Sequence, residues 1–271
     1  MPLHSLRQAL PVHRGRAAGQ SRPMTGARMS EVRLQPIMDR RERIIGFENL
    51  ARFVFDAFVG STEDAIASLS VDDLQRLTRE LLLGLRIRCM LDRSYANRLN
   101  SSQGDRQAVR HFVNIEKRSL AEPDLVEEII DSAVDLRSSG VLLVVEVTER
   151  PVDSFDGFRS YLQGLMRLKQ EGLLVALDDY DIDGPFHWEL DLGLCDFVKL
   201  DLPALGVPLH EDGAFMADRY AVLGEKLYAF IHRYQVDLVA EKVETEWQHE
   251  VVSGLPFKLF QGYRLGRPSR A

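Results

Sequence analysis

The chain of 271 residues has few cysteines, no long apolar run and no excess of positive charge. Its two cysteines, Cys89 and Cys195, are far apart and form no CxxC pair, which argues against a disulfide framework and against a structural zinc site. No apolar run approaches the roughly 20 residues that a membrane-spanning helix needs. The formal net charge is −7, whereas proteins that bind the phosphates of nucleic acid usually carry an excess of positive charge. We therefore expect a soluble, cytoplasmic protein that binds neither DNA nor membranes.

Several catalytic motifs are also absent. The histidines show no metal-ligand spacing and no HExxH motif, no glycine-rich phosphate loop follows an expected strand, and no serine occupies a nucleophile elbow. These absences exclude zinc peptidases of that type, P-loop and dinucleotide-binding proteins, and serine hydrolases with such an elbow.

The first 30 residues differ from the rest of the chain. They contain five arginines and no acidic residue, and their apolar residues follow no sustained period. Such a composition does not favour a packed structure. It predicts a disordered basic leader over residues 1–30 and one folded domain over residues 31–271.

The remaining sequence alternates between strand-like and helical patterns. Val32–Asp39 and Ile44–Arg52 are apolar runs joined by a short charged link, which predicts an antiparallel hairpin, and Val71–Ala96 has the spacing of one long helix. Later strand-like runs are His111–Ile115, Val141–Glu149, Leu173–Tyr180, Phe197–Leu202, Asp237–Glu244 and Lys258–Leu265. The amphipathic segments among them are Glu122–Leu136, Phe155–Gln170, Ala214–Tyr234 and Thr245–Val252. This alternation predicts an α/β fold, a modified TIM-type (β/α)8 barrel with an antiparallel first strand.

Polar residues gather near the ends of these expected strands. They are Asn114, Glu146, Asp178, Asp179, Lys199, Asp201, Glu241, Glu244 and Gln261, and Glu48 comes late in the second run. In a barrel the C-terminal strand ends converge on one face, where active sites lie. Clustered carboxylates and an amide repel one another unless they are neutralised, and their oxygens suit Mg²⁺ or Mn²⁺.

The adjacent pair Asp178 and Asp179 can serve two ions. Paired metal ions are a common device for displacement at a phosphodiester, and Lys199 adds positive charge for the phosphate or the attacking water. Each residue also has an alternative role. Asp201 and Glu149, taken singly, fit helix caps or turns, Lys199 fits a buried lysine paired with Asp201, and Arg52 fits a surface residue.

Eight short motifs in one order resemble those of the EAL domain family, from residue 32 to about residue 268. The motifs are QPI at Gln35–Ile37, GFENLAR at Gly46–Arg52, VNIEKRSL at Val113–Leu120, EVTE at Glu146–Glu149, ALDDY at Ala176–Tyr180, VKLD at Val198–Asp201, AEKVET at Ala240–Thr245 and QGYRLGRP at Gln261–Pro268. The resemblance implies a barrel that hydrolyses cyclic di-GMP to linear pGpG with Mg²⁺ or Mn²⁺, and a homodimer.

The same resemblance implies a role for each matching residue. Metal ligands would be Glu48, Asn114, Glu146, Asp178, Asp179 and Glu244. Glu241 would be the general base and Lys199 would hold the attacking water. Arg52 would grip a phosphate, Gln261 and Gln35 would contribute to substrate binding, and Glu149 would position the loop after the paired acids.

Two single residues and one loop depart from the family pattern. Asn49 stands where alanine is usual, and Lys242 stands where glycine is usual. Residues 180–188 replace a loop that is normally rich in Gly, Thr and Ser, and we expect Asp181 and Asp183 to add negative charge beside the paired acids. The altered loop leaves an alternative open: a weak or inactive domain that acts as a cyclic di-GMP receptor or binds a protein partner.

Overall fold

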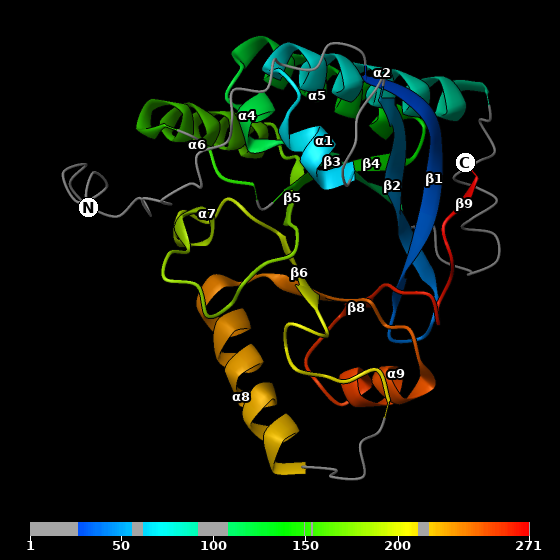
Figure 1. The fold of residues 1–271 in the computed structure, drawn as a ribbon, viewed down its shortest axis with the longest axis vertical. Helices are drawn as coiled ribbons and strands as arrows, with labels where there is room; N and C mark the ends of the chain where they lie inside the picture. Colours follow the sequence, from blue (N-terminus) through cyan, green and yellow to red (C-terminus); the bar gives the residue numbers. More distant parts are fainter. Residues whose placement is uncertain are drawn as a thin grey trace.

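The computed structural model describes residues 27–55, 62–91, 108–148, 150–152, 154–210 and 217–270. Strands alternate with helices along most of this part of the chain (Figure 1). The strands are β1 (Ala27–Asp39), β2 (Ile44–Phe55), β3 (Val109–Ile115), β4 (Val141–Val147), β5 (Leu174–Leu177), β6 (Phe197–Asp201), β7 (Asp237–Glu241), β8 (Leu259–Phe260) and β9 (Ser269–Arg270). The helices are α1 (Thr62–Ala67), α2 (Val71–Leu91), α4 (Lys117–Leu120), α5 (Pro123–Ser138), α6 (Phe155–Gln170), α7 (Trp188–Asp191), α8 (Ala217–Tyr234) and α9 (Glu246–Ser253).

The sheet closes into a barrel. Strands β2 to β8 pair in chain order and in parallel, and β1 closes the ring by pairing antiparallel with both β8 and β2. Strand β9 pairs antiparallel with β1 at Arg33 and Leu34. The predicted barrel with an antiparallel first strand is therefore confirmed.

Several predicted strand bounds need correction, and β5 and β7 end three residues before their expected ends at Tyr180 and Glu244. β1 begins at Ala27, so residues 27–30 belong to the hairpin with β2 and not to a disordered leader. Ala27 is fully buried and packs with Leu69, Leu74 and Leu77 from the region of α1 and α2, a long-range contact that local composition does not reveal. β8 is much shorter than the expected run Lys258–Leu265, because the chain turns sharply after Phe260. Residues 1–26 and the loop expected over residues 100–107 lie outside the described residues.

Local signals account for the helix starts. Ser154 precedes α6, and its hydroxyl accepts a hydrogen bond from the Gly157 amide. Thr245 and Gln248 form a reciprocal capping box at the start of α9. α6 coincides with its expected range, while the described part of α2 ends at Leu91. None of the helices in the described ranges is both long enough and apolar enough to cross a bilayer.

Two layers of side chains point into the barrel. The lower layer, here called the apolar ring, takes one residue from each of seven strands: Ile37, Phe112, Val144, Ala176, Phe197, Val239 and Leu259. Side chains alternate along a strand, so the residues two positions further toward the C-terminal face also point inward. The residues between them pack against the helices in the main hydrophobic core. This alternation determines which side chains reach the open end of the barrel.

Candidate functional site

The inward positions above the apolar ring are all polar. This polar ring consists of Gln35, Glu48, Asn114, Glu146, Asp178, Lys199, Glu241 and Gln261, each from a different strand or strand end. Six of the eight are buried, and only Asn114 and Asp178 are partly exposed. The fold therefore brings together most of the polar residues expected on this face, whereas Asp179, Asp201 and Glu244 lie outside the ring.

Lys199 lies at the centre of the polar ring. Its ammonium is 2.6 Å from Glu146 Oε1, 2.8 Å from Glu241 Oε1 and 3.1 Å from Asp178 Oδ1, and Glu48 Oε2 lies 3.6 Å away. Burial by itself lowers the pKa of Lys199, but the surrounding carboxylates outweigh burial and raise this pKa well above its usual value. Lys199 is therefore a permanently charged ammonium, and it contacts four acids rather than the single partner Asp201.

One ammonium cannot neutralise four carboxylates. Burial raises the pKa of Glu146 well above its usual value, and it raises the pKa of Glu241 to about 8 even though Lys199 opposes the shift. Desolvation also raises the pKa of the partly exposed Asp178, but the charge and the hydrogen bond of Lys199 bring this pKa below its usual value. The site therefore retains a deficit of positive charge, which a divalent cation would fill.

Amide side chains hold Glu48 in place. Asn114 Nδ2 donates to Glu48 Oε1 over 2.9 Å, and Gln261 Nε2 donates to Glu48 Oε2. Gln261 Nε2 also lies 3.3 Å from Gln35 Oε1. These donors leave the amide oxygens of Asn114 and Gln261 buried without a hydrogen-bond partner.

The unpartnered oxygens fit a hard cation. Asn114 Oδ1 and Glu146 Oε2 are both buried without a hydrogen bond, although buried polar atoms are normally paired. In addition, one carboxylate oxygen from each of Asp178, Asp179 and Glu241 lies within 4.8 Å of the others. Oxygen donors of these types match the preferences of Mg²⁺ and Mn²⁺.

Asp178 and Asp179 differ in exposure although their carboxylates lie close together. The Asp178 amide donates to Val147 O and the Tyr180 amide donates to Lys199 O, so the backbone stays attached to both neighbouring strands. Between them Asp179 has a φ of 43°, and its side chain is exposed. Asp178 thus contacts Lys199, and the more exposed Asp179 carboxylate lies beside it, within 4.8 Å of the Asp178 and Glu241 oxygens.

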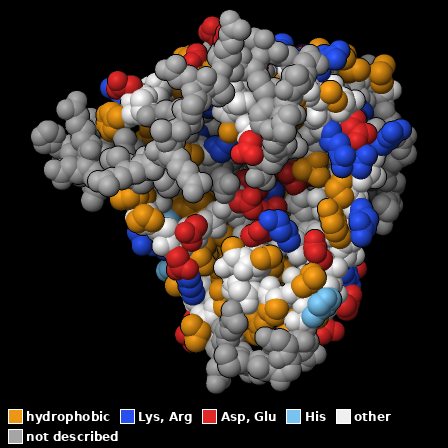
Figure 2. All heavy atoms as spheres, viewed as in Figure 1, with side chains coloured by type: hydrophobic (Ala, Val, Ile, Leu, Met, Phe, Trp, Pro, Cys, Tyr) orange, Lys and Arg blue, Asp and Glu red, His pale blue; other side chains and the backbone are white. Residues whose placement is uncertain are grey.

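Three cavities adjoin above the polar ring. One of about 280 Å³ lies directly over the acids, and it shares Asp178 and Asp179 with a second of about 400 Å³ that extends toward α1 and α2. The third, of about 610 Å³, lies beside the segment 203–209 and shares Lys242 and Glu244 with the first. Figure 2 shows acidic and basic side chains together near the centre of this face.

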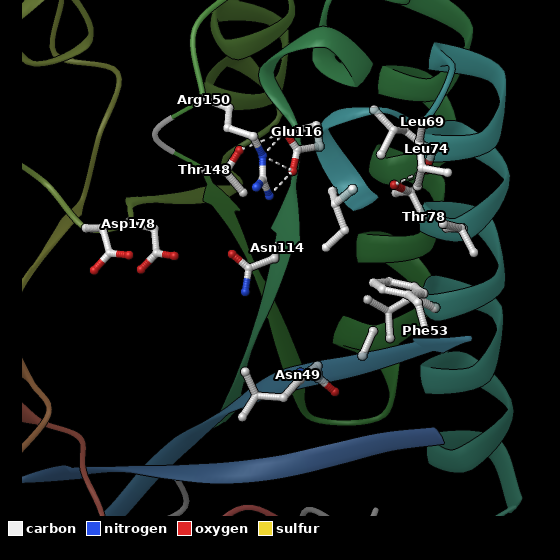
Figure 3. A pocket seen from close by; sticks show the side chains of 16 residues that line it. Asn49, Phe53, Leu69, Leu74, Thr78, Asn114, Glu116, Thr148, Arg150 and Asp178 are labelled. Atoms are coloured by element: carbon white, nitrogen blue, oxygen red, sulfur yellow. Dashed lines mark hydrogen bonds and ion pairs between the residues drawn. The ribbon is translucent and has the colours of Figure 1, made fainter. Parts of the chain in front are cut away.

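Glu116 and Arg150 line a cavity, although their positions in the sequence did not mark them as site residues. The Arg150 guanidinium donates to both carboxylate oxygens of Glu116, and Thr148 donates to the same carboxylate. Figure 3 shows this cluster above Asn114, in the cavity whose other parts carry Asp178 and the apolar side chains of α2. The available sequence signal was an acid and a base placed shortly after two consecutive strands.

Two predicted site residues are not placed in these cavities. Arg52 is exposed and lies 3.5 Å from Glu31 on the neighbouring strand β1, and it does not line the three cavities. Glu149 lies outside the described residues. Glu244 is exposed at the rim that separates two of the cavities.

The loop over residues 180–188 is attached to α8. Both carboxylate oxygens of Asp183 bind Lys226 of α8, and Asp181 Oδ1 accepts the amide of Asp183. Tyr180 and His187 are joined by a 2.5 Å hydrogen bond, and both rings contact Phe230 of α8. The expectation that Asp183 adds charge beside the paired acids was wrong, because Lys226 holds its carboxylate on the α8 side.

Comparison with known proteins agrees with this geometry. The model of the EAL domain family matches residues 23–268. The chain is 26% identical over 172 residues to the probable cyclic di-GMP phosphodiesterase PdeA of Escherichia coli, covering 60% of this chain and 21% of that protein. It is 31% identical over 126 residues to the cyclic di-GMP phosphodiesterase CdgJ of Vibrio cholerae, covering 46% of this chain and 25% of that protein. The chain thus spans about a quarter or less of these relatives.

Among solved structures, the EAL enzyme Bd1971 in its form with cAMP and cyclic di-GMP bound superposes with a TM-score of 0.66. The identity is 19%, and the match covers 89% of this chain and 62% of that one. A likeness at this identity establishes the barrel, and the match to the family model extends over nearly the whole sequence. The chain therefore belongs to the EAL domain family.

Proposed function

We propose that this chain is a metal-dependent phosphodiesterase that hydrolyses cyclic di-GMP to linear pGpG in bacterial second-messenger signalling. The observation that carries the proposal is the polar ring: four carboxylates share one ammonium, and buried oxygens of Asn114 and Glu146 remain unpartnered. A cluster of this kind is costly to bury unless a ligand compensates it. The activities named for the relatives PdeA and CdgJ support the same reaction.

The donors divide into two groups around Asp178. Glu48, Asn114, Glu146 and Asp178 would hold one Mg²⁺ or Mn²⁺, and the exposed Asp179 and Glu244 would serve a second beside it. When bound, such ions neutralise phosphate charge and increase the acidity of bound water.

The chain supplies the base and a fixed positive charge. Glu241 would accept a proton from the attacking water, because its carboxylate lies in the ring beside Lys199 and Asp178. As the water oxygen bonds to phosphorus, the bond from phosphorus to the 3′ oxygen breaks and this oxygen takes a proton. The product is a linear dinucleotide with a 5′ phosphate. Lys199 would hold the water and stabilise the charge that develops.

The adjoining cavities suit an elongated, two-base ligand. The central cavity would hold the reacting phosphodiester over the acids, and the cavities on either side have partly apolar walls that fit bases. Gln35 and Gln261 would form the floor. Arg52 would grip a phosphate after leaving Glu31, and the loop-positioning role of Glu149 remains a prediction.

One observation favours a second function. Residues 180–188 contact α8 through Lys226 and Phe230, and the neighbouring Asp179 is exposed. The alternative is a receptor that binds cyclic di-GMP without turnover and reports its occupancy to a protein partner.

Turnover and binding distinguish these functions. With Mn²⁺, the purified chain should convert cyclic di-GMP to pGpG, as measured by chromatography. Glu241→Gln should lower kcat at least about a hundredfold, because it removes the base, while Kd changes little. Glu246→Gln is the matched control, since Glu246 is an exposed acid at the start of α9 that forms an ion pair with Arg264. Binding without turnover would favour the receptor, and absence of both would contradict both functions.

A further inference from the structure

Lys242 has an unusual backbone conformation directly above the polar ring. It follows the last residue of β7 and has a φ of 57°, in the left-handed region that side chains other than glycine rarely occupy. Of the non-glycine residues with positive φ in the described ranges, Lys242 and Asp179 both lie on the face that carries the cavities. Conformational strain of this kind persists where the surrounding structure or the function requires it.

The contacts of Lys242 do not offset this strain. Its ammonium binds Asp201 Oδ2 at the end of the neighbouring strand β6, and 55% of its side chain is exposed. Exposed ion pairs contribute little to stability, and glycine adopts a positive φ without strain. Stability alone therefore favours glycine at position 242.

Lys242 places a positive charge in a cavity that has few exposed basic side chains. Among the described residues that line the cavity over the acids, it is the only basic one, alongside Glu48, Asp178, Asp179, Glu241 and Glu244. Lys199 also carries a positive charge, but it is fully buried and surrounded by carboxylates. An incoming phosphodiester therefore meets Lys242 as the accessible ammonium of this cavity.

Lys242 also stands at a junction. It lines both the cavity over the acids and the neighbouring cavity beside residues 203–209. A dinucleotide that extends from one cavity into the other must pass this side chain. A phosphate at the junction can replace Asp201 as its partner, because the ammonium is exposed and its long stem is flexible.

We propose that Lys242 binds a phosphate oxygen of the dinucleotide and exchanges Asp201 for that oxygen when the ligand enters. The inference rests on the proposed function, since it concerns the same cavity and ligand. It assigns to this chain a substrate-binding cation at a position where the backbone conformation favours glycine.

The experiment compares Lys242→Gly and Lys242→Arg with Lys258→Met in the full chain with Mn²⁺. Lys258 is a matched control, because it forms an exposed ion pair with Asp237 at the opposite end of β7. The KM for cyclic di-GMP is measured for each variant, and Kd is measured by calorimetry in a Glu241→Gln background that prevents turnover. Unfolding temperatures are recorded for all variants.

Lys242→Gly should raise KM and Kd about tenfold, the effect of losing one charge-assisted hydrogen bond. Its kcat should change less than about threefold, its affinity should depend less on salt, and its unfolding temperature should not fall. Lys242→Arg should restore most of the affinity, and Lys258→Met should match the original chain.

Unchanged KM and Kd in Lys242→Gly would overturn the inference while turnover by the original chain still supported the function. A gain in the number of bound Mn²⁺ ions without a loss of dinucleotide affinity would also overturn it, because Lys242 would then be replacing a cation. If the original chain neither binds nor cleaves cyclic di-GMP, the inference and the proposed function fall together.

Discussion

The apolar ring and the polar ring use the same strands for opposite purposes. Phe112 and Asn114 point into the barrel from β3, as Phe197 and Lys199 do from β6, and the two members of each pair are two positions apart in the sequence. The lower positions fill the interior with apolar side chains. The upper positions bury charged groups that are only partly neutralised. The difference shows that the fold needs inward side chains in both layers, whereas the charges in the upper layer require a functional reason.

The largest expected effect comes from removing the central charge of the polar ring. Lys199→Met leaves four clustered carboxylates, three of them buried, without their ammonium, so the free energy of unfolding should fall by about 3–5 kcal/mol in a chelating buffer. Mn²⁺ should restore much of this loss, because a cation can neutralise the same acids. Urea unfolding with and without Mn²⁺ measures both effects. Lys258→Met should stay within about 0.5 kcal/mol of the original chain. If Lys199→Met were as stable as the original chain in chelator, the polar ring would not depend on its central ammonium.

The two rings can be separated on β3 alone. Phe112→Ala opens a cavity in the apolar ring and should cost about 3–5 kcal/mol of stability while the folded protein retains Mn²⁺ affinity. Asn114→Ala should show the reverse pattern, with a small loss of stability and a clear loss of Mn²⁺ affinity. Urea unfolding and calorimetric Mn²⁺ titration give both quantities. If both substitutions lowered the two quantities in proportion, the rings would not have separate roles.

Divalent cations should stabilise the chain through the polar ring. At a Mn²⁺ concentration about 100 times Kd, linkage predicts a gain of about 2.7 kcal/mol in the free energy of unfolding. Asp178→Asn should reduce the gain because it removes one negative oxygen donor. Asp237→Asn should not reduce it, because Asp237 is the first residue of β7, at the end away from the polar ring. Thermal unfolding across a Mn²⁺ titration tests this, and an equal gain in both variants would place the binding elsewhere.

The smallest effect concerns His111, a buried residue next to Phe112 on β3. Its ring nitrogen lies 3.1 Å from the Asn49 amide, and burial together with the charge of Arg88 lowers its pKa to about 3. Below the ordinary histidine pKa of about 6.5, the unfolded chain binds a proton that the folded chain does not. Folding should therefore lose about 2 kcal/mol from this group by pH 5, with no loss above pH 7.

His111→Gln should remove this contribution. The dependence of unfolding free energy on pH between 6 and 4 should decrease by about one bound proton relative to the original chain. Urea unfolding across that range measures the slope. An unchanged slope would show that other groups account for the acid sensitivity.

The sequence predicted much of the fold and the site because both depend on local patterns. Alternation marked the strands, helical spacing marked α6 and α9, and polar residues at strand ends marked Asn114, Glu146 and Asp178 as neighbours. Glu116 and Arg150 were missed, because each is an ordinary charged residue until the register of β3 and β4 brings them together.

By itself, the sequence determined the order of the strands, the antiparallel first strand, and the set of carboxylates and amides that would share one face. These follow from side-chain period and from motif order, which are local properties. Only the tertiary structure decided that β1 starts at Ala27, that Asp183 pairs with Lys226, and that Lys199 contacts four acids. Each of these depends on contacts between segments distant in the chain, where register and burial determine which partners meet.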